Sequence, residues 1–212
     1  MSSSDQPQVP PILPDAWDQT ITDALGAFPR GLAFVQNGWQ ETGAPVRGTY
    51  MLGMLAPNPP LAKAFLTFNN YIASDCDLST RVKELLILST GWLRRCKYEF
   101  IMHVILGLRA GLTEAEIERV LEGPDAAGWS NEDAALLRAA DELCEHARIS
   151  DATWQALARD YSQQQLMDIV FVVGCYEIMA MAVLSFEVPM EAAELPLEEP
   201  FRSKMLAAFT DD

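Results

Sequence analysis

Histidine is scarce in this chain, and cysteine is not arranged in pairs. Only His103 and His146 occur among the 212 residues, and none of the four cysteines forms a Cys-x-x-Cys pair. Structural zinc sites usually combine closely spaced cysteines and histidines, and small disulfide-framework proteins are short and cysteine-dense. We therefore expect neither a metal centre nor a disulfide scaffold.

Basic residues are also few. The chain has 15 Lys and Arg against 30 Asp and Glu, a formal net charge of −15. A strongly negative surface repels phosphate backbones and anionic lipids, so this balance argues against nucleic-acid and membrane-surface partners. The partner that we expect is a small molecule.

Targeting and membrane-spanning segments are absent from the sequence pattern. The N-terminal stretch MSSSDQPQVPPILPD lacks the basic and apolar regions of a signal peptide. The longest apolar run, MDIVFVVGCYEIMAMAVL, contains Glu177. This run fits a buried core helix or interface helix better than a membrane span, and we expect a soluble, cytoplasmic protein.

No segment shows the alternation of a strand bounded by hairpin turns, and helical spacing of apolar residues recurs from Pro59 onward. The sequence predicts an all-α chain of at least six helices. Its predicted parts are a flexible arm (1–14), a single all-α domain (15–188) and an acidic tail (189–212). Within the domain, Pro29 and Gly31 are expected to interrupt a helical pattern, and NGWQETGAPVRGTY (37–50) to form a loop. Helix starts are expected at Ser79, Thr113, Ser130 and Ser150 or Asp151.

The stretch CKYEFIMH carries the candidate site. Cys96, Glu99 and His103 stand at i, i+3 and i+7, so on one helix they project within an arc of about 60°. A carboxylate one turn from an imidazole could orient it for proton transfer. Each residue also has an ordinary interpretation: a small core cysteine, a surface glutamate and a hydrogen-bonded core histidine.

Glu84 is a second candidate carboxylate, twelve residues before Cys96 and inside the apolar run ELLILSTGW. In one straight helix the two residues would lie roughly 18 Å apart. They meet only if the helix breaks, and Gly91 is the expected place. Glu84 also has an ordinary interpretation as a residue near a helix start.

The stretch RVKELLILSTGWLRRCKYEFIMHVILGLRAGLTEAEIERV resembles the carboxymuconolactone decarboxylase-like superfamily, which includes proteins of the alkyl hydroperoxide reductase D type (AhpD). The redox branch of that family has a glutamate, a Cys-x-x-Cys pair twelve residues on, and a histidine four residues after the second cysteine. Glu84, Cys96, Glu99 and His103 fall at those positions, with Glu99 in place of the second cysteine. The resemblance covers roughly residues 57–188.

This resemblance implies a compact all-α multi-helix bundle of the AhpD type that forms homo-oligomers, commonly dimers, trimers or hexamers. Peroxide reduction in such a site needs a second thiol to resolve the sulfenic acid, and Glu99 cannot do so. The decarboxylase branch works without a cofactor through acid/base residues. The chain is thus expected to be a cofactor-independent lyase, decarboxylase or isomerase acting on a small organic acid or lactone.

In this reading His103 transfers the proton, and Glu99 orients it or acts as a second acid/base. Glu84 hydrogen-bonds within the site, and Cys96 lines the pocket. The residues expected to contact substrate are Tyr176, Trp92 and Arg95, with Arg94 or Lys97 as alternatives to Arg95. Two other readings stay open: a single-cysteine peroxidase or AhpD-like redox protein in which Cys96 is oxidised, and a non-catalytic oligomeric scaffold.

Overall fold

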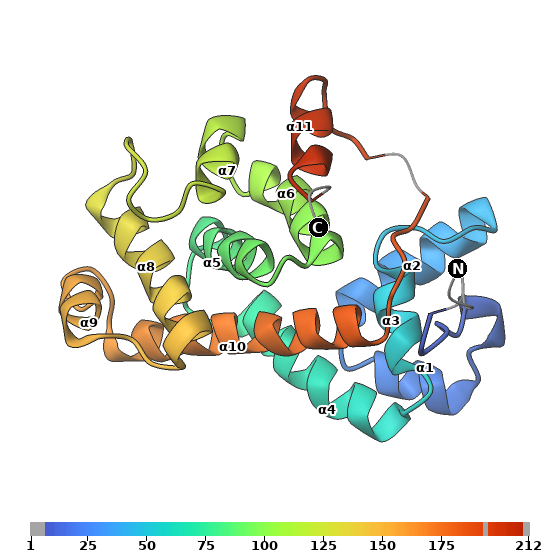
Figure 1. The fold of residues 1–212 in the computed structure, drawn as a ribbon. Helices are drawn as coiled ribbons and strands as arrows, with labels where there is room; N and C mark the ends of the chain where they lie inside the picture. The colour runs from blue at the N-terminus through green and yellow to red at the C-terminus, as the bar shows by residue number, and fades with distance from the viewer. Residues whose placement is uncertain (1–6, 193–194, 210–212) are drawn as a thin grey trace. The chain divides into compact units, whose positions relative to one another are not determined.

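The computed structural model describes residues 7–192 and 195–209, and within them it is helical, with no strand (Figure 1). The predicted all-α fold is confirmed. Residues 1–6 of the predicted arm, and residues 193–194 and 210–212 of the predicted tail, lie outside the described residues. The helices are α1 (Gln19–Leu25), α2 (Pro29–Thr42), α3 (Thr49–Leu55), α4 (Pro59–Asn70), α5 (Thr80–Leu93), α6 (Lys97–Arg109), α7 (Glu114–Val120), α8 (Asn131–His146), α9 (Asp151–Leu157), α10 (Gln163–Ser185) and α11 (Phe201–Ala207), with a 3-10 turn (Pro14–Ala16) before α1 and a π-helical turn (Tyr71–Asp75) after α4.

Four helices begin where their capping residues predict. The side chains of Ser79, Thr113, Ser130 and Ser150 each accept a hydrogen bond from a backbone N–H in the first turn of the helix that follows. At α7 the bond is reciprocal, because the Glu116 carboxylate also accepts from the Thr113 N–H. These caps satisfy donors that have no partner within the helix.

The predicted loop over 37–50 is confirmed only for residues 43–48 and is wrong at both ends. Helix α2 continues to Thr42, and α3 begins at Thr49. Pro29 does not interrupt this helix but begins it, because a first-turn proline gives up no helical hydrogen bond. Gly38, which read as a loop signal, sits inside α2 where a Cβ would lie 2.6 Å from Val46 Cγ1. Its small size serves a tertiary contact and not a turn.

The chain forms two compact units. The first consists of residues 1–75 and 181–194, and the second of residues 76–180 and 195–212. The single all-α domain expected over residues 15–188 stays a prediction. In the first unit α4 contacts both α1 and α3. The Ile12 N–H donates to the carbonyl of Gly53 in α3 (3.1 Å), which ties the N-terminal segment to that helix.

The second unit is built around α5. Every residue of α5 from Val82 to Gly91 is buried, and the helix packs against α6, α7 and α8 (Figure 1). Arg81, at the start of α5, binds Glu116 of α7 and Asp133 of α8. One guanidinium therefore links three helices around the buried α5, and its pKa is raised by these two carboxylates.

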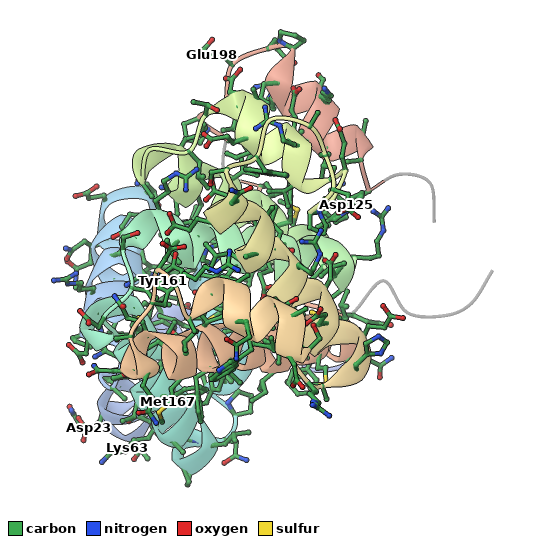
Figure 2. All side chains as sticks on the ribbon, turned by 90° about the vertical axis from the view of Figure 1, so that its left-hand side faces the viewer. Asp23, Lys63, Asp125, Tyr161, Met167 and Glu198 are labelled. Carbon is green, nitrogen blue, oxygen red and sulfur yellow. The ribbon has the colours of Figure 1, made fainter. Side chains whose placement is uncertain are left out.

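Helix α10 is long and apolar. By length and composition alone it could cross a membrane, with a hydropathy of 2.0 in its most apolar window and 56% of that window buried inside the protein. A core helix of a soluble protein meets the same criteria, so this is weak evidence for a membrane span. Its exposed face carries Met167 (labelled in Figure 2), Phe171 and Ile178, each about half exposed.

The acidic tail contains a helix that the sequence pattern did not predict. Helix α11 packs against α6, with Phe201 and Met205 buried. Lys204, on its outer side, forms an ion pair with Glu118 of α7 (2.6 Å). The tail is thereby part of the second unit and lies close to the start of α6.

Candidate active site

A tight connection between α5 and α6 organises the candidate site. Helix α5 ends at Leu93, and α6 begins at Lys97. Arg95 in the connection has a positive φ of 53°, a conformation that reverses the chain direction. The two helices therefore run antiparallel in contact, and residues near the start of α5 face residues in the middle of α6.

This reversal brings Glu84 to His103. The Glu84 Oε2 and His103 Nδ1 atoms lie 2.7 Å apart, and their side chains are 9% and 13% exposed. The helix break that the sequence placed at Gly91 falls instead at residues 94–96. Gly91 serves another purpose, because a Cβ there would lie 3.3 Å from the Phe100 nitrogen. It allows α5 and α6 to approach closely.

Tyr176 of α10 lies against the imidazole. The rings of Tyr176 and His103 are perpendicular, with centroids 4.9 Å apart. Tyr176 itself is buried. An edge-to-face contact of this kind fixes the plane of the imidazole from one side, while Glu84 holds it at Nδ1 from another. His103 is therefore oriented by residues of two other helices.

Glu99 is not the residue that contacts His103. Its side chain is 2% exposed, and in the described part of the chain neither carboxyl oxygen has a hydrogen-bond partner. Burial raises the pKa of Glu99 well above its ordinary value, and the nearby charge of Glu177 raises it further. Burial and the Glu177 charge therefore both favour the protonated, uncharged form of Glu99.

Cys96 is the N-cap residue of α6 and is fully buried. Burial raises the pKa of its thiol to about 12, and the Glu99 charge adds to this effect. A hydrogen bond from the Glu99 backbone N–H to the sulfur works in the opposite direction but does not prevail. The thiol is therefore protonated at neutral pH, and a helix N-terminus by itself does not activate it here.

Glu177 is a residue of this neighbourhood that sequence reasoning did not assign. Its carboxylate accepts a hydrogen bond from Arg94 Nε, and the thiol of Cys144 donates to it. Burial and this bond raise the pKa of Cys144 above its ordinary value. The signal was present in the sequence, since a charge inside the apolar run of α10 needs a partner.

Arg95 and Trp92 lie together on the far side of the connection. The Arg95 guanidinium carbon sits 4.3 Å from the centroid of Trp92. The Nη2 group of Arg95 also donates a hydrogen bond to the Ala208 carbonyl at 2.9 Å. Of the predicted residues, the structure thus groups Glu84, His103 and Tyr176, places Cys96 and Glu99 together, and engages Arg95 with Trp92 and the tail.

No disulfide joins the four cysteines. Among the residues that the structure describes, no group of three or more His, Cys, Asp and Glu side chains is arranged to hold a metal ion. The Glu84–His103 pair and the buried carboxyl group of Glu99 are groups that can take part in proton transfer.

The helical fold is shared with solved structures of AhpD-like proteins. The debrominase Bmp8 superposes with a TM-score of 0.69 at 15% identity, covering 95% of this chain and 97% of that chain. A cysteine-to-alanine variant of the same debrominase, in complex with 2,3,4-tribromopyrrole, gives a TM-score of 0.68 at 16% identity over 98% and 100%. A peroxidase-related protein with an alkylhydroperoxidase AhpD core from Ralstonia eutropha JMP134 gives 0.64 at 15% over 79% and 89%. These likenesses define the class of fold.

The sequence also matches a family model. Residues 59–142 match the model of the carboxymuconolactone decarboxylase family, a segment that contains Glu84, Cys96, Glu99 and His103. This match, together with the likeness of fold to AhpD-like structures, supports the resemblance to the carboxymuconolactone decarboxylase-like and AhpD-like superfamily that is seen in the sequence. Among curated proteins, no sequence matches the chain significantly.

Proposed function

We propose that the protein is a cofactor-independent acid/base enzyme, a lyase of the decarboxylase kind or an isomerase, acting on a small organic acid or lactone. The observation that carries this proposal is the 2.7 Å contact between Glu84 Oε2 and His103 Nδ1 in a nearly buried setting. When the Glu84 carboxylate accepts a hydrogen bond from Nδ1–H, the lone pair of the imidazole lies on Nε2, where it can take a proton from substrate. His103 then has the form of a general base.

Glu99 complements His103 as the acid. Because burial and the Glu177 charge raise the pKa of Glu99 well above its ordinary value, its protonated form is favoured and it can serve as a proton donor. In an isomerisation, His103 would remove a proton beside a carbonyl group and Glu99 would return one to the delocalised anion. In a decarboxylation, the C–C bond breaks to release carbon dioxide, the electron pair enters an unsaturated lactone system, and Glu99 protonates that carbanion.

The buried thiol supports proton transfer over peroxide reduction. A peroxidatic cysteine reacts as a thiolate that peroxide can reach. Cys96 is 0% exposed, and its pKa is raised to about 12. We assign Cys96 to the wall of the site. Selective labelling of Cys96 by a sulfenic-acid probe after mild peroxide would instead support the single-cysteine redox alternative.

Substrate contacts and assembly are part of the same proposal. Tyr176 and Trp92 would line the site, and Arg95, which also contacts the tail, would bind a substrate carboxylate. We further propose a cytoplasmic homo-oligomer, a dimer, trimer or hexamer, that binds neither nucleic acid nor membranes. The charge of −15 supports the last point.

The test is a screen followed by matched variants. Thermal shift against small carboxylic acids and lactones identifies a ligand, and turnover of that compound is then measured. His103→Ala is expected to lose at least about 100-fold in kcat, the usual scale of a general acid–base group. The control is His146→Ala, because the His146 side chain is 64% exposed. Full activity of His103→Ala with the fold retained would contradict the proposal.

A further inference from the structure

The C-terminal segment places one aromatic side chain against the α5–α6 connection. The Phe209 ring lies edge-on to Trp92, with centroids 5.5 Å apart, and 5.3 Å from the ring of Phe100. The Arg95 guanidinium carbon sits 5.1 Å from the Phe209 centroid. Phe209 therefore contacts the last turn of α5, the connection and the first turn of α6 at once.

The three residues that Phe209 contacts lie on both sides of the buried Cys96 in the sequence. Trp92, Arg95 and Phe100 stand four residues before, one residue before and four residues after Cys96. Cys96 is 0% exposed, and the neighbouring Glu99 is 2% exposed. The segment that Phe209 covers is thus the segment that carries both buried groups of the site.

Arg95 joins the tail to the backbone geometry of the site. A non-glycine residue with a φ of 53° is strained, and such strain persists where surrounding contacts hold it. Two of the contacts of Arg95 come from the tail: its guanidinium donates to the Ala208 carbonyl at 2.9 Å, and its guanidinium carbon lies 5.1 Å from the centroid of Phe209. Loss of the tail contacts would release the residue that immediately precedes Cys96.

We propose that residues 195–209 form a cover over the α5–α6 connection, with Phe209 as its plug, and that opening of this cover admits small molecules to Cys96 and Glu99. The inference concerns access and stands independently of the reaction that the site performs. Phe201 and Met205 anchor α11 by burial, whereas Phe209 at the end of the cover is held by aromatic pairs and a cation–π contact. Such contacts are individually modest, so the end of the cover that carries Phe209 can open without global unfolding.

The test measures thiol access in the full chain with iodoacetamide under native conditions. Phe209→Ala is expected to increase the alkylation rate of Cys96, located by mass spectrometry, by at least about tenfold. Cys175 is the internal reference, because it is also 0% exposed and lies on α10. Its rate should stay within about twofold, since the cover does not act on it.

Two further variants keep the result unambiguous. Phe209→Leu retains an apolar plug and should fall between the parent and Phe209→Ala. Ser203→Ala, on an exposed position of α11, should match the parent. Labelling of Cys96 at the parent rate in Phe209→Ala would overturn the proposal, and so would equal acceleration of Cys96 and Cys175, which indicates general destabilisation.

Discussion

Glu99 differs from most acidic side chains of this chain because its carboxyl group is buried. It is 2% exposed, it faces the close approach of α5 and α6, and neither of its carboxyl oxygens has a partner in the described part of the chain. A buried carboxyl without a hydrogen bond costs free energy, on the order of 1–3 kcal/mol. Enzymes use buried carboxyl groups with a raised pKa as proton donors, and the burial of Glu99 fits that use.

The titration of Glu99 predicts how stability depends on pH. The folded-state pKa is raised above the ordinary value of 4.5, so the contribution of Glu99 is fully present below about pH 4.5. It is lost as the pH rises, because the unfolded chain ionises first. Glu99→Gln does not titrate. We expect the Tm of Glu99→Gln, relative to the parent, to rise by at least about 3 °C between pH 4.5 and 8.

The measurement is a thermal melt of both proteins across that pH range. Glu122→Gln, at an exposed position, serves as the control and should show no such trend. A Tm difference between parent and Glu99→Gln that is independent of pH would mean that Glu99 ionises normally in the folded protein.

At the scale of elements, the α5–α6 hairpin creates the site. Capping residues and apolar spacing were enough to predict where α5 starts, at Ser79. The reversal was not predictable from local pattern, because it depends on a positive φ at Arg95, where the residue type gives no signal. Once the chain reverses, Glu84 meets His103 across the two helices, while the i, i+4 neighbour Glu99 turns away into the core.

A substitution at Gly91 tests how closely α5 and α6 must approach each other. A Cβ at position 91 would lie 3.3 Å from the Phe100 nitrogen and 3.4 Å from Glu99 Oε1. Gly91→Ala should therefore destabilise the protein by about 1–3 kcal/mol, despite the higher helix propensity of alanine.

The control is the same substitution where there is room. Gly174 lies inside α10, and nothing stands within 4 Å of a Cβ built there. Gly174→Ala should be neutral or stabilising by up to about 1 kcal/mol. Urea unfolding of the two variants should give changes of opposite sign. Equal effects would mean that the α5–α6 approach is not tight.

At the scale of the whole molecule, an apolar face of α10 predicts association. Three apolar side chains on this face are about half exposed: Met167 (55%), Phe171 (51%) and Ile178 (47%). Phe171 follows Met167 by four residues, and Ile178 follows Phe171 by seven. This spacing forms one helix face, of the type that packs against another helix. It supports the proposed homo-oligomer.

A charge on this face should weaken association. We expect the parent to elute above its monomer mass in size-exclusion chromatography with light scattering, and Ile178→Glu to shift toward smaller species. Leu106→Glu, on exposed apolar surface of α6, is the matched control and should behave as the parent. A monomeric parent at about 100 μM would contradict the proposal.

The sequence by itself determined the helical class, four helix starts and the resemblance to a family, because these depend on short-range periodicity, on caps within four residues and on a motif with fixed spacing. It also placed Glu84, Cys96, Glu99 and His103 in one motif. Tertiary structure decided which carboxyl meets the imidazole, that Glu99 and Cys96 are buried, and that the tail reaches the α5–α6 connection. These outcomes depend on packing between segments distant in the chain, which local sequence pattern does not encode.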